Sequence, residues 1–371
     1  MRFTLYPIYW LSDEVDDEQF DLTRLPFDVI ENVRIEAVSQ RFRPHAFDLG
    51  RERLGTGILD ELEAVRYALV HRYEPEPIIS EQTGEVLGHK QSNESSEMLV
   101  RQVAACLRLI RPMRQSALLM RGDVRGDGTF DVTGYDVPPL HLIEVPDVQK
   151  LFKLRNQDAD DLRNYAPGFL QGMRGEFWKF RMAVQFHELG HFQPLSWKAR
   201  YLLWCSAIES IYTSHGWEHQ GSLVATSRIK WFIGENTSIY APGDIPSLLE
   251  DPHLTVRQIV PDLYKMRNFM AHGDKIPEPF FQDILRHGLN GDVVKPEVLM
   301  EAASFIIRTS LLKILRDGLL NHFTDAGSAE AYFEAQNLTK SALRRFERVS
   351  IRRRLKFLIR AVWALVAGGM P

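Results

Sequence analysis

The chain has 371 residues, of which 44% are hydrophobic and 25% are charged, and its formal net charge is −4. This composition is typical of a globular protein long enough for two domains, and it excludes a chain with an overall basic field. Binding to nucleic acid would therefore depend on a local basic patch.

The N-terminal segment and the cysteines indicate a cytoplasmic protein. The start, MRFTLYPIYWLSDEVDDE, turns acidic at once and lacks the basic region, apolar run and cleavage site of a signal peptide. Cys106 and Cys205 both lie in apolar stretches and are predicted to be buried free thiols. No apolar run reaches the roughly 18–20 residues of a membrane span, so we expect none.

Up to about residue 150 the pattern mixes strands with one helix. The helix is predicted over residues 95–112, with two serines at its start and Pro112 as its stop. A polar segment rich in turn residues, 74–96, is predicted to be a loop or a small hairpin. Short alternating runs predict strands at residues 34–42, 117–124, 129–137 and 140–145.

After about residue 168 the apolar residues recur with helical spacing. Helices are predicted near 169–192, 196–216, 220–234, 255–272, 297–322 and 328–347, with another close to the end. The fold class expected from this order is an α+β N-terminal domain followed by an all-α domain. We place the first at 1–150, the helical domain at 168–325, and basic C-terminal helices at 326–371. The domain arrangement suggests that 1–150 has a sensing or regulatory role.

The segment TVRQIVPDLYKMRNFMAHGD carries the most informative residues. Its apolar stripe of isoleucine, leucine and two methionines predicts one core-facing helix. Arg267 flanks the stripe, whereas Asn268 and His272 are four residues apart and lie together on the polar side. Gly273 follows directly and is expected to end the helix.

These side chains suit metal-independent cleavage of RNA. The helix dipole favours the protonated form of His272. An imidazole near its working pKa is the usual proton-transfer group for attack by an RNA 2′-hydroxyl. The planar guanidinium of Arg267 could stabilise a phosphate that gains charge in the transition state. Asn268 could bind the phosphate or orient the histidine. On spacing alone, however, an ordinary capping histidine and a surface arginine are the favoured interpretation.

The sequence YKMRNFMAHG resembles the signature of the HEPN superfamily, an arginine followed after four to six residues by a histidine. More narrowly, the chain is similar to the Apea-like HEPN group. That group shows an upstream helix matched here by RYLLWCSAIESIY, with Arg200, Ala207 and Glu209, and a further helix matched by TSRIKWFIG. The resemblance covers roughly residues 168–325 and is sharpest from Arg200 to Asp274.

The resemblance implies a helical bundle that forms a homodimer, with the two Arg–His motifs meeting across the interface. It implies an endoribonuclease that leaves a cyclic phosphate and uses no cofactor, in which Arg267, Asn268 and His272 are catalytic and Glu209 and Arg200 support them. Many members of the family act in anti-phage defence, abortive infection or toxin–antitoxin systems. RNA, a phage trigger or an antitoxin-like protein are the partners expected on this basis. Other members have lost catalysis and bind only RNA or protein.

A second motif, FHELGH, offers an alternative function. His187 and His191 stand at i and i+4, as in zinc peptidases, with Glu188 in the place of the general base. Glu209 lies 18 residues further on, near the spacing of a third ligand. The breaker-rich FQPLS follows directly, and the five-residue pattern is short, so an ordinary face of a bundle helix is the favoured interpretation.

Three weaker signals remain. DVRGDGTFD resembles a calcium loop, but Arg125 occupies a ligand position, so we interpret it as a hairpin turn. The cations from Arg344 to Lys356 could follow an RNA backbone or form a solvated helix face. The C-terminal LKFLIRAVWALVAGGMP is predicted to pack on the domain or on a second subunit, with a membrane surface as the alternative.

Overall fold

The structure is a computed structural model of the whole chain. It describes residues 1–8, 20–38, 66–89, 94–111, 119–136, 154–191, 196–213, 221–239, 255–274 and 295–336. The strand predicted at 140–145, most of the segment after residue 334 and the C-terminal basic run fall outside these residues.

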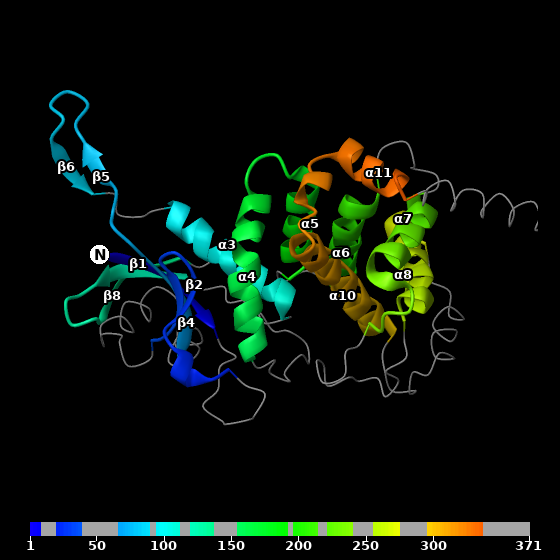
Figure 1. Cartoon of the computed structure of the whole chain (residues 1–371), viewed down its shortest axis with the longest axis horizontal. Helices are drawn as coiled ribbons and strands as arrows, with labels where there is room; N and C mark the ends of the chain where they lie inside the picture. The colour runs from blue at the N-terminus through cyan, green and yellow to red at the C-terminus, as the bar shows by residue number, and fades with distance from the viewer. Residues whose placement is uncertain are drawn as a thin grey trace, which may run out of the picture.

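An antiparallel sheet forms one end of the molecule (Figure 1). Its six strands have the order β2-β3-β4-β1-β7-β8, and a separate pair, β5-β6, forms a two-stranded ribbon. The central strand β1 pairs with β4 on one side and with β7 on the other. The bounds are β1 Arg2–Ile8, β2 Phe27–Ile30, β3 Val33–Ala37, β4 Tyr67–Tyr73, β5 Pro77–Ile79, β6 Val86–His89, β7 Leu119–Val124 and β8 Phe130–Asp136.

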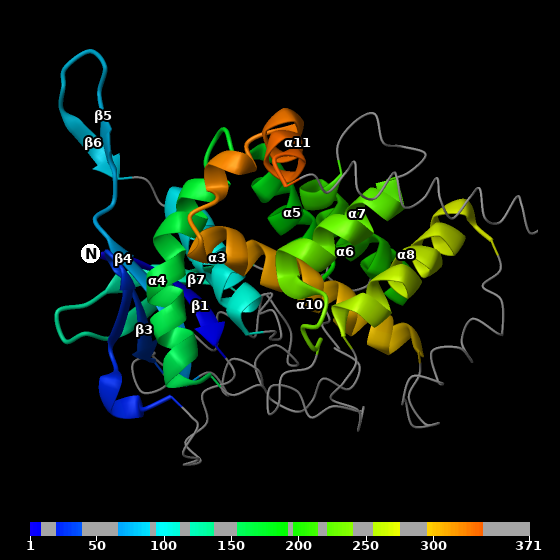
Figure 2. The ribbon, with the colours of Figure 1, turned by 45° about the vertical axis from the view of Figure 1, so that its right-hand side comes forward.

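The other regular elements of the described chain are helices. Figures 1 and 2 show α3 and α4 beside the sheet, followed by α5, α6, α10, α7 and α8 toward the other end. The α-helices are α3 Glu94–Ile110, α4 Asn156–Met173, α5 Trp178–Leu189, α6 Trp197–Tyr212, α7 Gly221–Ile229, α8 Val256–His272, α10 Lys295–Arg316 and α11 Ala326–Glu334. Short helical turns occur at η1 Leu22–Arg24, η2 Lys230–Gly234 and η3 Leu320–His322.

One continuous apolar core joins the sheet to the helices. Buried side chains run from Tyr6 in β1 through α3 and α4 to Phe333 in α11, across the boundary predicted near residues 150–168. Helix α3 packs on β1, β4 and α4, and α10 contacts α3, α4, α5, α6 and α8. The division into separate domains stays a prediction, but the core itself is shared by both parts.

The antiparallel sheet followed by helices agrees with the predicted α+β and all-α order, and several elements are confirmed individually. The predicted strands at 117–124 and 129–137 are β7 and β8, joined by the tight turn that was favoured over a calcium loop. Helices α3, α6, α8 and α10 lie where the periodicity predicts them, and the segment 74–96 contains the β5-β6 hairpin. Both cysteines are buried and free.

The prediction of one helix over 169–192 is wrong. The structure has two helices there, α4 and α5, and α4 already begins at Asn156. Pro167 lies inside α4, where its neighbours Ala166 and Phe169 are buried. Gly175, with a φ of 62°, adopts the left-handed conformation between the two helices, which glycine accepts without a steric penalty. Both helices bury an apolar face, so the helical spacing of apolar residues continues past Gly175 and gives no sign of the break.

Within the described residues, no helix is long and apolar enough to cross a membrane. The apolar C-terminal stretch lies outside the described part of the chain.

Candidate functional site

Helix α8 carries the Arg–Asn–x3–His sequence and has defined ends. At its start, Thr255 and Gln258 form a reciprocal capping box, in which the Thr255 backbone N–H donates to Gln258 Oε1 at 2.9 Å. At its end, Gly273 has a φ of 70° and caps the helix in the left-handed conformation. The predicted C-terminal stop directly after His272 is therefore confirmed.

The apolar stripe of α8 faces the core, as the spacing predicts. Ile259, Leu263 and Met266 are buried, and Met270 packs against the same core from a partly buried position. Helices α6, α7 and α10 are the neighbours of this face. The buried stripe fixes the rotation of the helix, so the polar residues of the motif must lie away from the core.

Polar contacts join α8 to α6. The Tyr201 hydroxyl donates to the backbone carbonyl of Leu263 at 2.6 Å, inside the core. Nearer to the end of α8, Arg267 Nη2 donates to Glu209 Oε2 at 3.0 Å. Both partners of this ion pair are partly exposed, with side-chain exposures of 30% for Arg267 and 24% for Glu209. Glu209 thus holds the arginine at the surface instead of burying it.

Asn268 and His272 lie on the exposed side of α8, close to its C-terminal end. Arg267 Nη1 also donates to Asn268 Oδ1 at 3.3 Å, so these two neighbours are oriented together. His272 is at position i+5 from Arg267, so the two side chains lie about 140° apart around the α-helix. Asn268 and His272 are at i and i+4 and lie only about 40° apart. The structure brings Glu209, Arg267 and Asn268 into contact and leaves His272 beside them, open to solvent.

Arg200 does not join this group. It lies nine residues before Glu209 on α6, which corresponds to the opposite side of the helix, about 180° away. Burial lowers the pKa of Arg200, and its charge acts on His191 of the HELGH segment. The Nε atom of Arg200 is buried and has no hydrogen-bond partner among the described residues. The predicted supporting pair is therefore divided: Glu209 contacts Arg267, and Arg200 lies near HELGH.

The glutamate of HELGH is held in an ion pair that ties the helices to the sheet. Arg108 of α3 donates from Nε to both carboxylate oxygens of Glu188, at 3.1 and 3.0 Å, and also from Nη2 to Oε2. The same guanidinium donates from Nη1 to the Tyr6 hydroxyl of β1 at 2.8 Å. Arg108 is almost fully buried, and Glu188 is 16% exposed. Glu188 is therefore the counter-charge of the buried Arg108.

The electrostatics of Glu188 argue against its use as a general base. Burial by itself raises the pKa of the carboxyl, but the Arg108 charge, the neighbouring His187 and the hydrogen bonds from Arg108 outweigh burial and leave the pKa well below its usual range. A carboxylate with so low a pKa accepts a proton poorly near neutral pH. A peptidase would need this proton transfer to activate water.

The two histidines of HELGH face each other. Their Nε2 atoms are 3.3 Å apart, and the Trp204 indole N–H donates to the backbone carbonyl of His187 at 3.1 Å. Burial lowers the pKa of both imidazoles, and for His191 the neighbouring His187 lowers it further, so both are neutral near pH 7.

Two nitrogen ligands of a tetrahedral zinc ion lie about 3.3 Å apart, so the span of this pair fits such a metal. Within the described residues, however, no group of three histidine, cysteine, aspartate or glutamate side chains could hold one. Glu209, the third ligand suggested by spacing, is engaged by Arg267 instead. The pair therefore supplies two of the four ligands of a zinc site, and the carboxylate beside it, Glu188, is held by Arg108.

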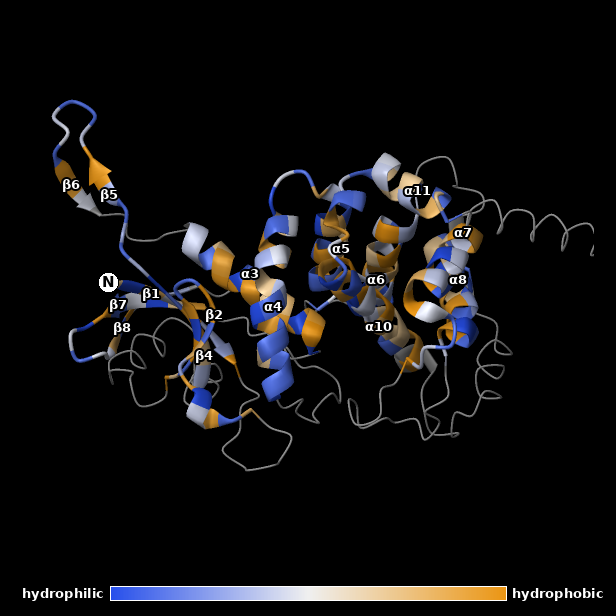
Figure 3. Ribbon diagram, viewed as in Figure 1, coloured by the Kyte–Doolittle hydropathy of each residue, from blue (hydrophilic) through white to orange (hydrophobic). Residues whose placement is uncertain are grey.

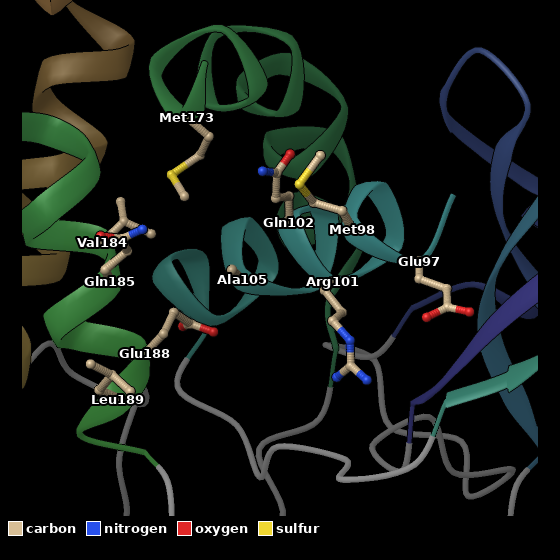
Figure 4. A pocket seen from close by; sticks show the side chains of 10 residues that line it. All are labelled: Glu97, Met98, Arg101, Gln102, Ala105, Met173, Val184, Gln185, Glu188 and Leu189. Carbon is tan, nitrogen blue, oxygen red and sulfur yellow. The ribbon is translucent and has the colours of Figure 1, made fainter. Parts of the chain in front are cut away.

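A groove of about 580 Å³ opens between α3, α4 and α5, next to Glu188 (Figure 4). Met98, Met173, Val184 and Leu189 make its lining largely apolar, and Figure 4 shows Gln102 and Gln185 among them. It lies away from α8 along the molecule, so it does not form part of the surface around His272.

Sequence analysis did not identify Arg108 and Tyr6 as partners of Glu188. One signal was present: Arg108 stands between apolar residues in ACLRLI, on a helix face that otherwise predicts core. A buried arginine requires a counter-charge, so such a position indicates an internal ion pair even when its partner is 80 residues away.

Comparisons of the chain with protein-family models, with curated proteins and with solved structures find no match. The functional argument therefore depends on the residues and on their geometry.

Proposed function

We propose that the protein is a metal-independent endoribonuclease of HEPN type. The arrangement at the end of α8 carries the proposal: Arg267 is held by Glu209 at 3.0 Å and contacts Asn268, while His272 lies exposed one turn further on. Core packing fixes this helix, so a phosphate would meet an arginine whose position is already set.

The chemistry that these groups support is an internal transesterification of RNA. The 2′-oxygen attacks phosphorus and forms a bond to it, the bond from phosphorus to the 5′-oxygen breaks, and a 2′,3′-cyclic phosphate remains. His272 would move the proton that leaves the 2′-hydroxyl or the one that the 5′-oxygen gains, a role worth about 10²–10⁴ in rate. Arg267 would stabilise the charge that grows on the phosphate oxygens.

The geometry of a single α8 supports a site made by two copies. Arg267 and His272 point about 140° apart around the helix, so one phosphate cannot easily lie between them on the same chain. Two α8 ends related by a two-fold axis would place the arginine of one copy toward the histidine of the other. We therefore include a homodimer in the proposal, with RNA as the substrate and a role in anti-phage defence or abortive infection.

The alternative of a zinc metallopeptidase has one observation in its favour, the facing Nε2 atoms of His187 and His191. The bidentate hold of Arg108 on Glu188 counts against it, because the presumed base is already engaged. A third alternative is a HEPN module that binds RNA or protein without cleaving it. It would use the same α8 surface, but His272 would have no catalytic role.

The test is cleavage of an end-labelled RNA in excess EDTA, with analysis of the product ends. We expect cleavage to continue and to yield 2′,3′-cyclic phosphates. Zinc-dependent cleavage of peptides without any RNA cleavage would replace this proposal with the peptidase, and tight RNA binding without products would replace it with the binding module.

A further inference from the structure

The β5-β6 ribbon is an exposed arm with apolar side chains. Ile78, Ile79, Val86 and Leu87 are 45%, 55%, 58% and 70% exposed, the highest values for a cluster of large apolar residues in the described chain. Figure 3 shows these apolar strands projecting from the sheet end of the molecule. Neither strand packs extensively on another described helix or strand. Apolar surface of this kind marks a site of interaction.

The ribbon is well formed although it packs on so little. Ser80 and Glu85 close the turn through a backbone hydrogen bond of 2.8 Å, and the Ser80 hydroxyl accepts from the backbone of Thr83 at 3.2 Å. Gly84, with a φ of 71°, supplies the left-handed residue that the turn needs. Neighbouring residues of a regular strand point to opposite faces, so Ile78 and Ile79 give each face of the ribbon an apolar side chain. The register shifts opposite this pair, at Leu87, and both Val86 and Leu87 are exposed.

A two-stranded ribbon is only marginally stable in water by itself, and two apolar faces suit insertion into a partner better than contact with a flat surface. The charge of the ribbon narrows the choice of partner. Residues 74–88 contain four glutamates and neither lysine nor arginine. This surface repels RNA and complements a partner that is both basic and apolar.

A segment with this character stands in the same chain. Residues 341–360 combine seven arginines and one lysine with leucine, isoleucine, valine and phenylalanine. They begin five residues after Gln336, the last described residue, and an extended chain covers at most about 3.3–3.6 Å per residue. Figures 1 and 2 draw α11, which precedes them, well apart from the ribbon. Because α11 and the ribbon lie at different places in one copy, we take the segment of a second copy as the partner of the ribbon.

We propose that the β5-β6 ribbon docks onto residues 341–360 of a second copy of this chain. The glutamates of the ribbon face the cations of that segment, and the apolar residues of both fill the interface. The contact is reciprocal in a dimer, because each copy supplies one ribbon and one basic segment. It is separate from the α8 surface and does not depend on ribonuclease activity.

Two charge-reversal variants of the full-length chain, mixed in pairs, test this contact. One variant, Glu81→Lys with Glu85→Lys, makes the ribbon basic; the other, Arg352→Glu with Arg353→Glu, makes the segment acidic. Energy transfer is measured between a donor on Gln82→Cys in one copy and an acceptor on Ser341→Cys in another. Cys106 and Cys205 are buried and should not react with the dyes.

We expect transfer between wild-type copies and between the two unlike variants, in which both contacts are matched again. Mixtures of two copies of the same variant should lose transfer, with the apparent dissociation constant raised by about tenfold or more. Glu31→Lys with Glu176→Lys changes the net charge equally at exposed sites elsewhere and should keep it. Equal transfer in all mixtures, or transfer in none, would overturn the proposal, whatever the RNA cleavage assay gives.

Discussion

Arg267 of α8 lies 3.0 Å from Glu209 of α6, and this contact joins two helices that the apolar core already holds together. An arginine with a free side chain would lose conformational entropy when it binds a phosphate. Glu209 has fixed the guanidinium in advance while leaving part of it exposed to a ligand. The glutamate is thus a positioning residue for the arginine in the proposed reaction.

Replacing Glu209 should impair cleavage much more than stability. For Glu209→Gln we expect a loss of RNA cleavage of about 10–100-fold, because a mobile Arg267 stabilises the transition state less well. The unfolding free energy should change by no more than about 1 kcal/mol, since both side chains are partly exposed. Single-turnover cleavage and urea unfolding measure the two effects.

A positioning role also predicts partial recovery by Glu209→Asp, which keeps the charge on a shorter side chain. Unchanged cleavage in Glu209→Gln would show that the ion pair is structural only.

A side chain at Gly273, the left-handed residue at the end of α8, should lower the stability of the protein. Gly273 has a φ of 70°, and a Cβ there would meet no neighbour, so the cost of Gly273→Ala comes from the backbone alone. We expect about 1–2 kcal/mol of destabilisation, measured by chemical unfolding. Gly126→Ala, also in open space but without a positive φ, is the matched control and should be nearly neutral.

The Arg108–Glu188 pair should contribute strongly to stability when only one partner is removed. Glu188→Gln or Arg108→Met leaves the remaining charge in the interior, where a counter-charge is missing, and should cost about 3–5 kcal/mol. The double variant should cost less than the sum of the two single ones, because no uncompensated charge remains. Additive losses in urea unfolding would show that the two side chains do not act as a pair.

The buried histidines predict a loss of stability in mild acid. Burial lowers the pKa of His187 and His191 in the folded protein, whereas the unfolded chain binds protons at each imidazole below about pH 6.5. Stability should therefore fall as the pH drops below about 6.5, by up to about 1.4 kcal/mol per pH unit for each histidine, until the lowered folded pKa is reached.

Other groups also titrate in this pH range. The contribution of His191 is therefore isolated by measuring the unfolding free energy of the wild type and of His191→Gln as a function of pH. The unfolding free energy of the variant should decline less steeply between pH 7.5 and 5. Parallel curves for the two proteins would contradict the predicted neutral state of His191.

The sequence predicted α8 to within one residue at its start and correctly at its end, because its local signals agree. The apolar stripe sets the face and Gly273 requires the end, and the structure adds Thr255 as the cap at the start. The same reasoning failed for α4, which was predicted to begin near residue 169 but begins at Asn156. Pro167 lies inside this helix, and its neighbours Ala166 and Phe169 are buried. Burial of this kind depends on tertiary packing, which local residues do not reveal.

Strand β4 was missed for a related reason. Four successive residues from Tyr67 to Val70 are buried, so the alternation that marks a half-buried strand is absent. The pairing of Arg108 with Glu188 spans 80 residues and that of Arg267 with Glu209 spans 58. Sequence spacing indicated which side chains carry chemistry, but only the packing of α3, α5, α6 and α8 decides which of them meet.

The central claim is that Arg267 and His272 cleave RNA without a metal ion. The most direct measurement compares RNA cleavage in excess EDTA by the wild type, Arg267→Ala and His272→Ala. Arg257→Ala, at an exposed position on the same helix, and His322→Ala, at an exposed histidine elsewhere, are the matched controls. We expect cleavage by the wild type and both controls, and a loss of at least about 100-fold in Arg267→Ala and in His272→Ala. Equal cleavage by all five proteins, or cleavage that EDTA abolishes in the wild type, would contradict this claim.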